Sequence, residues 1–387
     1  MNKVPKSTSE ILERSVQISD GLRQTSGDGV NMAFDVKYGI MFCLYMPGHQ
    51  GSYGESRGRI ALTYFPASQP TNSVTIEVAS GHTEYVPNII SLGDGKVRLF
   101  YEEDSKSDSD HVLSYKDYDY LTDTLTEAKT IMLKKDDGSV TPLTQGEEFR
   151  YLEERGLNDH TYLCTEQICM GGHTIFKGED GYHYGSISTY LSEVILYRSA
   201  DNLATVEFFA VCPYVSQYEF DYKILDGKIY ALFRTNRDVN AISWTISEDM
   251  GKTWSEPVEL EESIQCRPRV IVHNGHILMS YNYFNDDTGN RPPIQQGRTS
   301  IRMHLGEAEN PYDNPVVADL YSRYGIVNIA LVDVYGDVYM AYSTSELALE
   351  CQNYLLQAAY HDPAPVGRGK DAVRYVKLGD LTPKNYK

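Results

Sequence analysis

Long apolar runs and basic runs are both missing from this 387-residue chain. No stretch approaches about 18 uninterrupted apolar residues, so no membrane-spanning helix is predicted. Lysine and arginine number 35 against 54 acidic residues, and the formal net charge is −19. This charge disfavours nucleic acid and anionic membrane surfaces as partners. It leaves a small acidic ligand open, because a few local arginines decide such binding.

Cysteine is scarce, and its spacing excludes the common zinc patterns. The six cysteines are scattered, at positions 43, 164, 169, 212, 266 and 351, with no CxxC pair. Reduced, mostly buried thiols are therefore expected. The N-terminal stretch MNKVPKSTSEILERS lacks the apolar core of a signal peptide, which favours a cytoplasmic location. HExxH, EF-hand and phosphate-loop patterns are missing too, so we predict no metal and no cofactor.

Tyrosine and short apolar runs are what the chain has in quantity. It contains 31 tyrosines against 11 phenylalanines and 2 tryptophans, and 41% of its residues are hydrophobic. Tyrosine suits half-buried strands and also carbohydrate-binding surfaces. Long helical periodicity is nearly missing. These features favour a strand-rich protein with a proper core.

One pattern recurs six times: an apolar run, a tight turn containing glycine, and a second apolar run. Such turns are the strongest short-range signal for a β-hairpin. The turn glycines are Gly39, Gly95, Gly181, Gly227, Gly275 and Gly336. A third strand-like run follows most of these hairpins, at residues 59–65, 111–119, 193–201, 241–249 and 299–306. This repeat predicts an all-β fold, a six-bladed β-propeller.

We expect residues 1–387 to form a single propeller domain. The widest spacing between turn glycines predicts an insertion near residues 129–159, between the second and third repeats. Its charged sequence is interpreted as a long loop or hairpin over one face. Residues 9–16, SEILERSV, are predicted to form a short helix or an edge strand.

The stretch SEDMGKTW, residues 247–254, follows the third strand of the fourth repeat. Its Ser and Asp side chains are expected to bond the backbone of a tight turn, in which Gly takes a conformation that other residues resist. Trp254 is expected to pack between blades. A degenerate copy begins at Ser199, with Leu203 and Val206 in the Gly and Trp positions. The pattern resembles the Asp box of sialidases and other propellers, which marks the fold on the outer rim.

In a propeller, the first strand of each blade lines the central axis, and ligands bind at one end of it. The residues eight positions before each turn glycine are therefore candidates: Asn31, Pro87, His173, Glu219, Arg267 and Asn328. The second strands end near Tyr45, Tyr101, Arg234 and Tyr281, and Tyr85, Tyr218 and Tyr324 fall near the same rim.

Residues 214–342 resemble the sialidase superfamily. In that family a Glu at the start of the fourth blade precedes a hairpin, an Arg and an Asp box, as do Glu219 and Arg234 here. Arg298 fits a second family Arg, and Tyr324 fits a family Tyr, with Tyr321 as its rival. The resemblance implies an exo-glycoside hydrolase acting on a small acidic oligosaccharide. It implies Tyr324 as nucleophile and Glu219 as its base, while Arg234 and Arg298 bind the sugar carboxylate.

The first repeat departs from the family pattern. Asn31 stands where sialidases have a third Arg, and the following loop lacks the Asp that serves as general acid. Glu55 or His49 from that loop is expected to act as the acid. The missing guanidinium is expected to come from Arg57 or Arg267. Further contacts to the sugar are expected from Asn31, His173 and Tyr218.

Three other interpretations remain open. Glu219 and Arg234 are equally compatible with a structural ion pair. His173, Tyr184 and Arg234 suit a lyase acting on uronate glycans, which forms an unsaturated product that absorbs ultraviolet light. A glycan-binding or scaffold propeller without catalysis is the third. The sugar, its linkage and the oligomeric state do not follow from the sequence.

Overall fold

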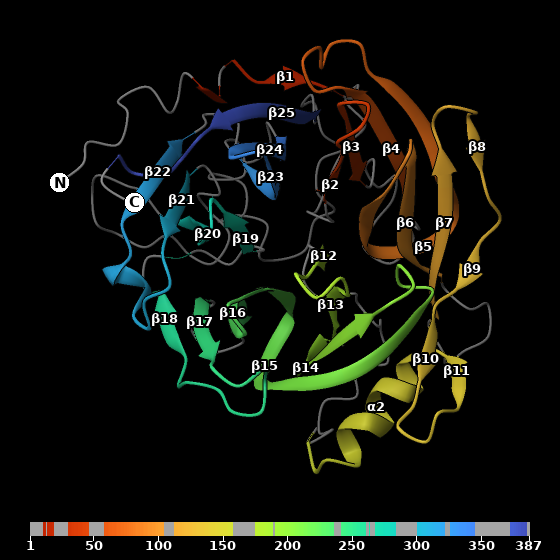
Figure 1. Cartoon of the computed structure of the whole chain (residues 1–387), viewed down its shortest axis with the longest axis vertical. Coiled ribbons are helices and arrows are strands. Elements are labelled where there is room, and N and C mark those ends of the chain that lie inside the picture. Colours follow the sequence, from red (N-terminus) through yellow and green to blue (C-terminus); the bar gives the residue numbers. More distant parts are fainter. Residues whose placement is uncertain are drawn as a thin grey trace, which may run out of the picture.

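The computed structural model describes most of the chain as a ring of strands (Figure 1). Described are residues 11–12, 14–18, 30–45, 58–103, 112–157, 175–188, 190–235, 241–260, 263, 268–283, 300–321, 326–344 and 372–384. Only the backbone is considered at 58–59, 80–86, 103, 190–192, 215–218, 321, 327–328, 344 and 372. Within these limits the strands form a six-bladed β-propeller, as the sequence predicted.

The first three blades contain the following strands in chain order. Blade 1 has β2 (Val30–Asp35), β3 (Ile40–Tyr45), β4 (Gly58–Pro66) and the first part of β5 (Val74–Gly93). Blade 2 has the rest of β5, β6 (Lys96–Glu103), β7 (Val112–Asp119), β8 (Thr124–Leu125) and β9 (Lys129–Thr130). Blade 3 has β12 (Phe176–Lys177), β13 (His183–Ile187), β14 (Tyr190–Ser199) and the first part of β15 (Thr205–Leu225).

The other three blades follow the same plan. Blade 4 has the rest of β15, β16 (Lys228–Thr235), β17 (Ile242–Ser247) and β18 (Val258–Leu260). Blade 5 has β19 (Arg269–His273), β20 (His276–Tyr283), β21 (Ser300–Leu305) and β22 (Val316–Tyr321), with the 3-10 helix η1 (Pro311–Asp313) between the last two. Blade 6 has β23 (Val327–Val334), β24 (Asp337–Thr344), β25 (Ala372–Gly379) and β1 (Val16–Gln17).

The six predicted hairpin turns are confirmed. All six turn glycines have positive φ, between 68° and 86°. In each hairpin the strand before the turn pairs antiparallel with the strand after it. The long strands β5 and β15 each leave one blade as its outer strand and enter the next as its inner strand. For this reason six blades correspond to four hydrogen-bonded sheets.

The ring closes in blade 6 with a strand from the start of the chain. Val16 pairs with Tyr375, so β1 is the outermost strand beside β25. The predicted edge strand is therefore present at the end of the 9–16 stretch, after a short helical turn at residues 11–12. The sequence did not predict β25, because its hairpin pattern stops at β24.

The predicted insertion contains a helix that the sequence analysis did not expect. After β9 the chain forms the hairpin β10 (Met132–Lys134) and β11 (Val140–Pro142), then α2 (Gln145–Glu153). The side chain of Thr144 caps α2 by accepting a hydrogen bond from Glu147 N. Leu133 and Leu152 join the apolar cluster between blades 2 and 3, and β10 pairs parallel with β15. In Figure 1 these elements lie on the outside of the ring.

The core consists of apolar layers between neighbouring blades. Each of the six blade junctions has its own cluster of buried residues. Alternate side chains of a strand point to its two neighbouring blades, which explains why the strands are apolar on both faces. The described inner strands also carry buried polar side chains, among them Asn31, Asn88 and Glu219. No helix of the described residues is long and apolar enough to cross a membrane.

The turn at residues 247–254 has the hydrogen bonds predicted for it. Ser247 Oγ accepts from Gly251 N at 2.7 Å, and Asp249 accepts from Thr253 N at 2.8 Å. Trp254 packs between blades 3 and 4 and donates to Val211 O at 2.9 Å. The turn joins the third strand of blade 4 to its outermost strand.

The degenerate copy in blade 3 repeats this arrangement. Ser199 Oγ accepts from Leu203 N, and Asp201 Oδ1 accepts from Thr205 N, each at 2.8 Å. Leu203 takes the left-handed conformation, with φ 66°, where Gly251 has φ 87°. The Ser and Asp bonds therefore hold the turn even without glycine.

Candidate functional site

Among the residues given a role in the predicted hydrolase site, three have described side chains. These are Glu219, Arg234 and Asn31; Tyr218 is described in its backbone alone. The other predicted residues lie outside the described part of the chain: Tyr324, Glu55, His49, Arg298, Arg57, Arg267 and His173. The candidate site is therefore built from the strands that lead to these positions.

Glu219 and Arg234 face one another across the β15–β16 hairpin. Arg234 Nη1 lies 2.9 Å from Glu219 Oε1. Only 7% of the glutamate side chain and 12% of the arginine side chain are exposed. A buried charge needs such a partner, because desolvating it alone costs several kcal/mol. The structure thus brings together two residues that the sequence had predicted as base and carboxylate clamp.

Asn31 links the inner strands of blades 1 and 2. Its side chain is 2% exposed, and Nδ2 donates to Pro87 O at 2.6 Å. Among the described residues, its Oδ1 has no hydrogen-bond partner. A buried neutral amide therefore occupies the start of the inner strand of blade 1.

Asp221 and Lys223 continue the polar face of β15 toward its turn. Asp221 Oδ2 accepts from Val270 N at 2.9 Å, which ties blade 4 to blade 5. Lys223 Nζ lies 3.5 Å from Asp221 Oδ1 and 4.5 Å from the centre of the Phe176 ring. Burial lowers the pKa of Lys223 to about 8, although Asp221 opposes the shift.

Arg269 joins three blades. It is fully buried, its Nε donates to Ile329 O in blade 6, and its Nη2 donates to Val30 O in blade 1 at 3.3 Å. The sequence analysis assigned no role to Arg269. The structure places Arg269 in a positioning role, with its guanidinium on backbone carbonyls.

Asn282 and Tyr283, at the end of β20, were missed by the sequence reasoning. Asn282 Nδ2 donates to Ser300 O at 3.2 Å and to Ile326 O at 3.0 Å. Tyr283 donates its hydroxyl to Asp319, and burial raises its pKa to about 12. A usable signal was the polar Asn282 within the apolar run HILMSYNY.

The residues drawn together for a lyase are separated. Tyr184 is the second residue of β13, close to the blade 3 turn, and donates to Asp180 at 2.6 Å. Arg234 lies near the far end of the corresponding strand in blade 4, β16. Burial also raises the pKa of Tyr184 to about 12. Tyr184 and Arg234 therefore lie at different ends of their strands, and His173 lies outside the described residues.

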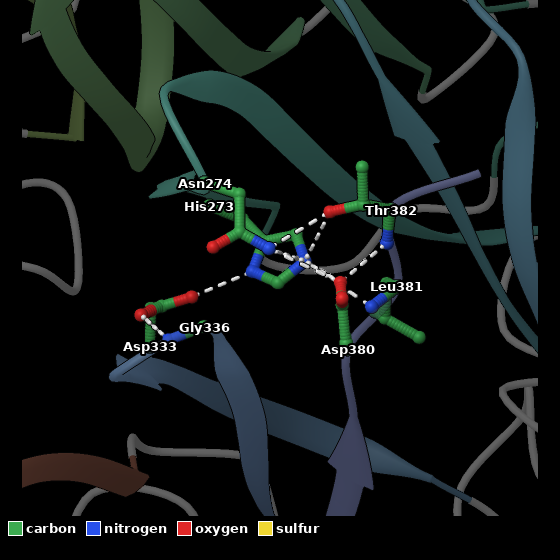
Figure 2. Close-up of polar contacts among 7 residues, drawn as sticks. All are labelled: His273, Asn274, Asp333, Gly336, Asp380, Leu381 and Thr382. Atoms are coloured by element: carbon green, nitrogen blue, oxygen red, sulfur yellow. Dashed lines mark hydrogen bonds and ion pairs between the residues drawn. The ribbon is translucent and has the colours of Figure 1, made fainter. Parts of the chain in front are cut away.

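A second polar cluster lies at the turn end of blades 5 and 6 (Figure 2). His273 Nδ1 is 2.5 Å from Asp333 Oδ2, and Leu381 N donates to His273 Nε2 at 3.1 Å. Asp380 Oδ1 also lies 3.2 Å from His273 Nε2, so carboxylates flank both ring nitrogens. The cluster holds the segment after β25 against the turns. No group of three or more potential metal ligands occurs in the described part of the chain.

The fold is similar to solved sialidases at low sequence identity. A Trypanosoma rangeli sialidase bound to 2,3-difluoro-KDN has a TM-score of 0.56 and 12% identity, over 91% of this chain and 54% of that one. The Hadza microbial sialidase Hz136 has a TM-score of 0.59 and 12% identity, over 94% and 68%. A protein of unknown function from Dyadobacter fermentans has a TM-score of 0.56 and 12% identity, over 94% and 99%.

These similarities concern the fold alone. This chain spans about half the length of the Trypanosoma rangeli enzyme. No protein-family model and no curated protein sequence matches the chain. Chemistry must therefore be inferred from its own residues.

Proposed function

We propose that this protein is a sialidase-like exo-glycoside hydrolase acting on sialic acid or a related small acidic sugar. The observation that carries the proposal is the buried Glu219–Arg234 pair at 2.9 Å. It lies in the β15–β16 hairpin of blade 4, at the end away from the turn. The pair precedes the 247–254 turn with its Asp-box pattern. Solved sialidases with this fold have sialic acid, the inhibitor DANA or a covalent intermediate as ligand.

Local charge supports an acidic substrate despite the overall charge of −19. Along the described inner part of blades 4 and 5, three cationic side chains accompany two carboxylates. The cations are Arg234, Lys223 and Arg269, and the carboxylates are Glu219 and Asp221. Buried arginines attract an anionic group more strongly than exposed ones, because water screens them less.

The proposed roles are those that the resemblance to sialidases implies, and side-chain chemistry is compatible with them. Tyr324 is the nucleophile, since a carboxylate nucleophile would be repelled by an acidic sugar. Glu219 takes the phenol proton, and Arg234 with Arg298 binds the substrate carboxylate. Asn31 contributes a neutral amide in this site. Glu55 or His49 is proposed as the general acid.

The test is hydrolysis of a fluorogenic sialic acid substrate by the wild type and by Tyr324→Phe, Glu219→Gln and Arg234→Lys. Tyr324→Phe and Glu219→Gln are expected to lower kcat/KM by about 10²-fold or more. Arg234→Lys is expected chiefly to raise KM, because lysine cannot form the paired bonds of arginine. Arg98→Lys is the matched control, since Arg98 pairs with Asp117 at 2.7 Å in blade 2.

A lower kcat/KM in Tyr324→Phe and Glu219→Gln and a higher KM in Arg234→Lys, with the control unchanged, support the proposal. A wild type that turns over no sialoside at any enzyme concentration rejects it. Uronate oligosaccharides followed in the ultraviolet would then test the lyase alternative. Binding without turnover, lost in Glu219→Gln, would identify a glycan-binding propeller.

A further inference from the structure

One buried amide in blade 5 contacts two backbone segments at once. The Asn282 side chain is fully buried in β20. Its Nδ2 donates to Ser300 O at 3.2 Å and to Ile326 O at 3.0 Å. An amide nitrogen carries two hydrogens and so can serve two carbonyls together. Asn282 therefore fixes the distance between these two points of the backbone.

Both points lie next to proposed functional residues. Ser300 is the first residue of β21 and follows Arg298 by two positions. Ile326 directly precedes β23 and follows Tyr324 by two positions. The same amide thus links two described backbone points, and each lies two positions along the sequence from a residue of the proposed site.

The start of β23 is irregular where it is held. Its register with β24 shifts between Val327 and Ile329. A bulge interrupts the regular ladder and re-aims side chains, and bulges are frequent near active sites. Here two carbonyls beside the shift accept from blade 5 side chains, Ile326 O from Asn282 and Ile329 O from Arg269. Blade 5 therefore holds this irregular stretch on both sides.

We propose that Asn282 is a positioning residue that sets the Arg298 and Tyr324 segments relative to each other. This inference rests on the proposed function, in which these two residues bind and attack the sugar. Asn282 acts through the backbone and has no direct part in the chemistry. Its effect should be large, because a shift of about 1 Å in a reacting group costs on the order of 10²-fold in rate.

The decisive variant is Asn282→Leu, which keeps the branched side-chain shape and removes both donated bonds. The matched control is Asn314→Leu, because Asn314 is also a buried blade 5 amide, 5% exposed, and accepts from Ala308 N at 3.1 Å. We expect kcat to fall on the order of 10²-fold in Asn282→Leu and less than about 3-fold in the control. Asn282→Ser, which keeps one donor, replaces the leucine variant if that variant does not fold.

A double variant separates positioning from general destabilisation. If Asn282 acts through Tyr324, adding Asn282→Leu to Tyr324→Phe should cause little further loss of kcat. Losses that multiply in the double variant overturn the proposal, as does an Asn282 variant with wild-type kcat.

If the wild type has no turnover, the proposed function fails and kcat cannot test Asn282. Amide hydrogen exchange then tests directly whether Asn282 anchors the two backbone segments. Faster exchange at residues 300–305 and 326–331 in Asn282→Leu, and in neither segment of Asn314→Leu, would uphold the double anchoring. Unchanged exchange in both segments would overturn it.

Discussion

At the scale of single residues, three buried charged side chains lie on one face of β15. Glu219, Asp221 and Lys223 alternate along that face, so all three point the same way. Each finds a specific partner: Arg234, the backbone N–H of Val270, and Asp221. Burial of this kind is expensive and adds little stability, which favours a functional reason for it.

Lys223 gives a pH-dependent prediction. Its pKa in the folded protein is lowered to about 8, against 10.5 for the free side chain. Between these values the unfolded chain binds more protons than the folded one, so stability rises with pH in that window. Below about pH 8 the cost of burying the charge is fully present. We expect the wild type to gain stability relative to Lys223→Met from pH 8 to pH 10.

Urea unfolding at steps from pH 7 to pH 10 measures this difference. The comparison stops near pH 10, because tyrosines such as Tyr222 have raised pKa values and remain protonated in the folded protein. Their ionisation in the unfolded chain lowers stability above that pH and opposes the lysine effect. Parallel pH profiles for wild type and Lys223→Met would contradict the assignment.

At the scale of elements, the 247–254 turn requires glycine at position 251, both for its backbone conformation and for the space around it. Gly251 has φ 87°, and an added Cβ would lie 2.4 Å from Ala210 Cβ. Gly227 has φ 75° with open space around its Cβ position. At either position a residue with a Cβ would be strained by about 1–2 kcal/mol in the left-handed conformation. At position 251 its Cβ would also clash with Ala210, whereas at position 227 it would not.

Gly251→Ala is therefore expected to destabilise the fold more than Gly227→Ala. The clash adds about 1–3 kcal/mol of overpacking to the conformational term that the two variants share. Free energies of unfolding in urea give the comparison. Equal losses would mean that blades 3 and 4 separate easily at Ala210, contrary to the packing described here.

Local signals explain which elements the sequence could predict. A glycine turn between two apolar runs reports its own geometry, and all six hairpins were found this way. β25 follows β24 only after residues 345–371, and β1 has two residues that show no period. α2 depends on the contact of Leu152 with the cluster between blades 2 and 3. Such long-range partners leave no local pattern.

The residues of the candidate site also fall into two groups, those within one hairpin and those that contact another blade. Glu219 and Arg234 belong to one hairpin, and the sequence had left an ion pair between them open as one interpretation. Arg269 and Asn282 contact carbonyls of the next blade, at Ile329 and Ile326. Backbone carbonyls have no sequence identity, and contacts to them were therefore invisible before the strands were placed.

At the scale of the whole molecule, both ends of the described chain stabilise blade 6. Leu12 is 3% exposed and belongs to the apolar cluster between blades 5 and 6. Ser15 Oγ lies 2.7 Å from Tyr342 Oη, and β1 covers the edge of β25. The segment after β25 is held at the turn end by His273. Closure of the ring thus depends on these terminal segments.

Loss of the N-terminal contacts should weaken the ring as a whole. We expect Leu12→Ala to lower the free energy of unfolding by about 2–5 kcal/mol, as for other core leucines. Leu121→Ala is the control, because Leu121 is 52% exposed. Deletion of residues 1–18 should also expose the β25 edge and promote aggregation, since an unpaired strand edge is a template for pairing.

Urea unfolding and size-exclusion chromatography measure the two effects. A propeller built from independent blades would lose stability only in blade 6, and its unfolding would divide into two transitions. Shared apolar layers between all neighbouring blades predict instead one transition at a lower midpoint. A Leu12→Ala variant as stable as Leu121→Ala would show that β1 and Leu12 do not close the ring.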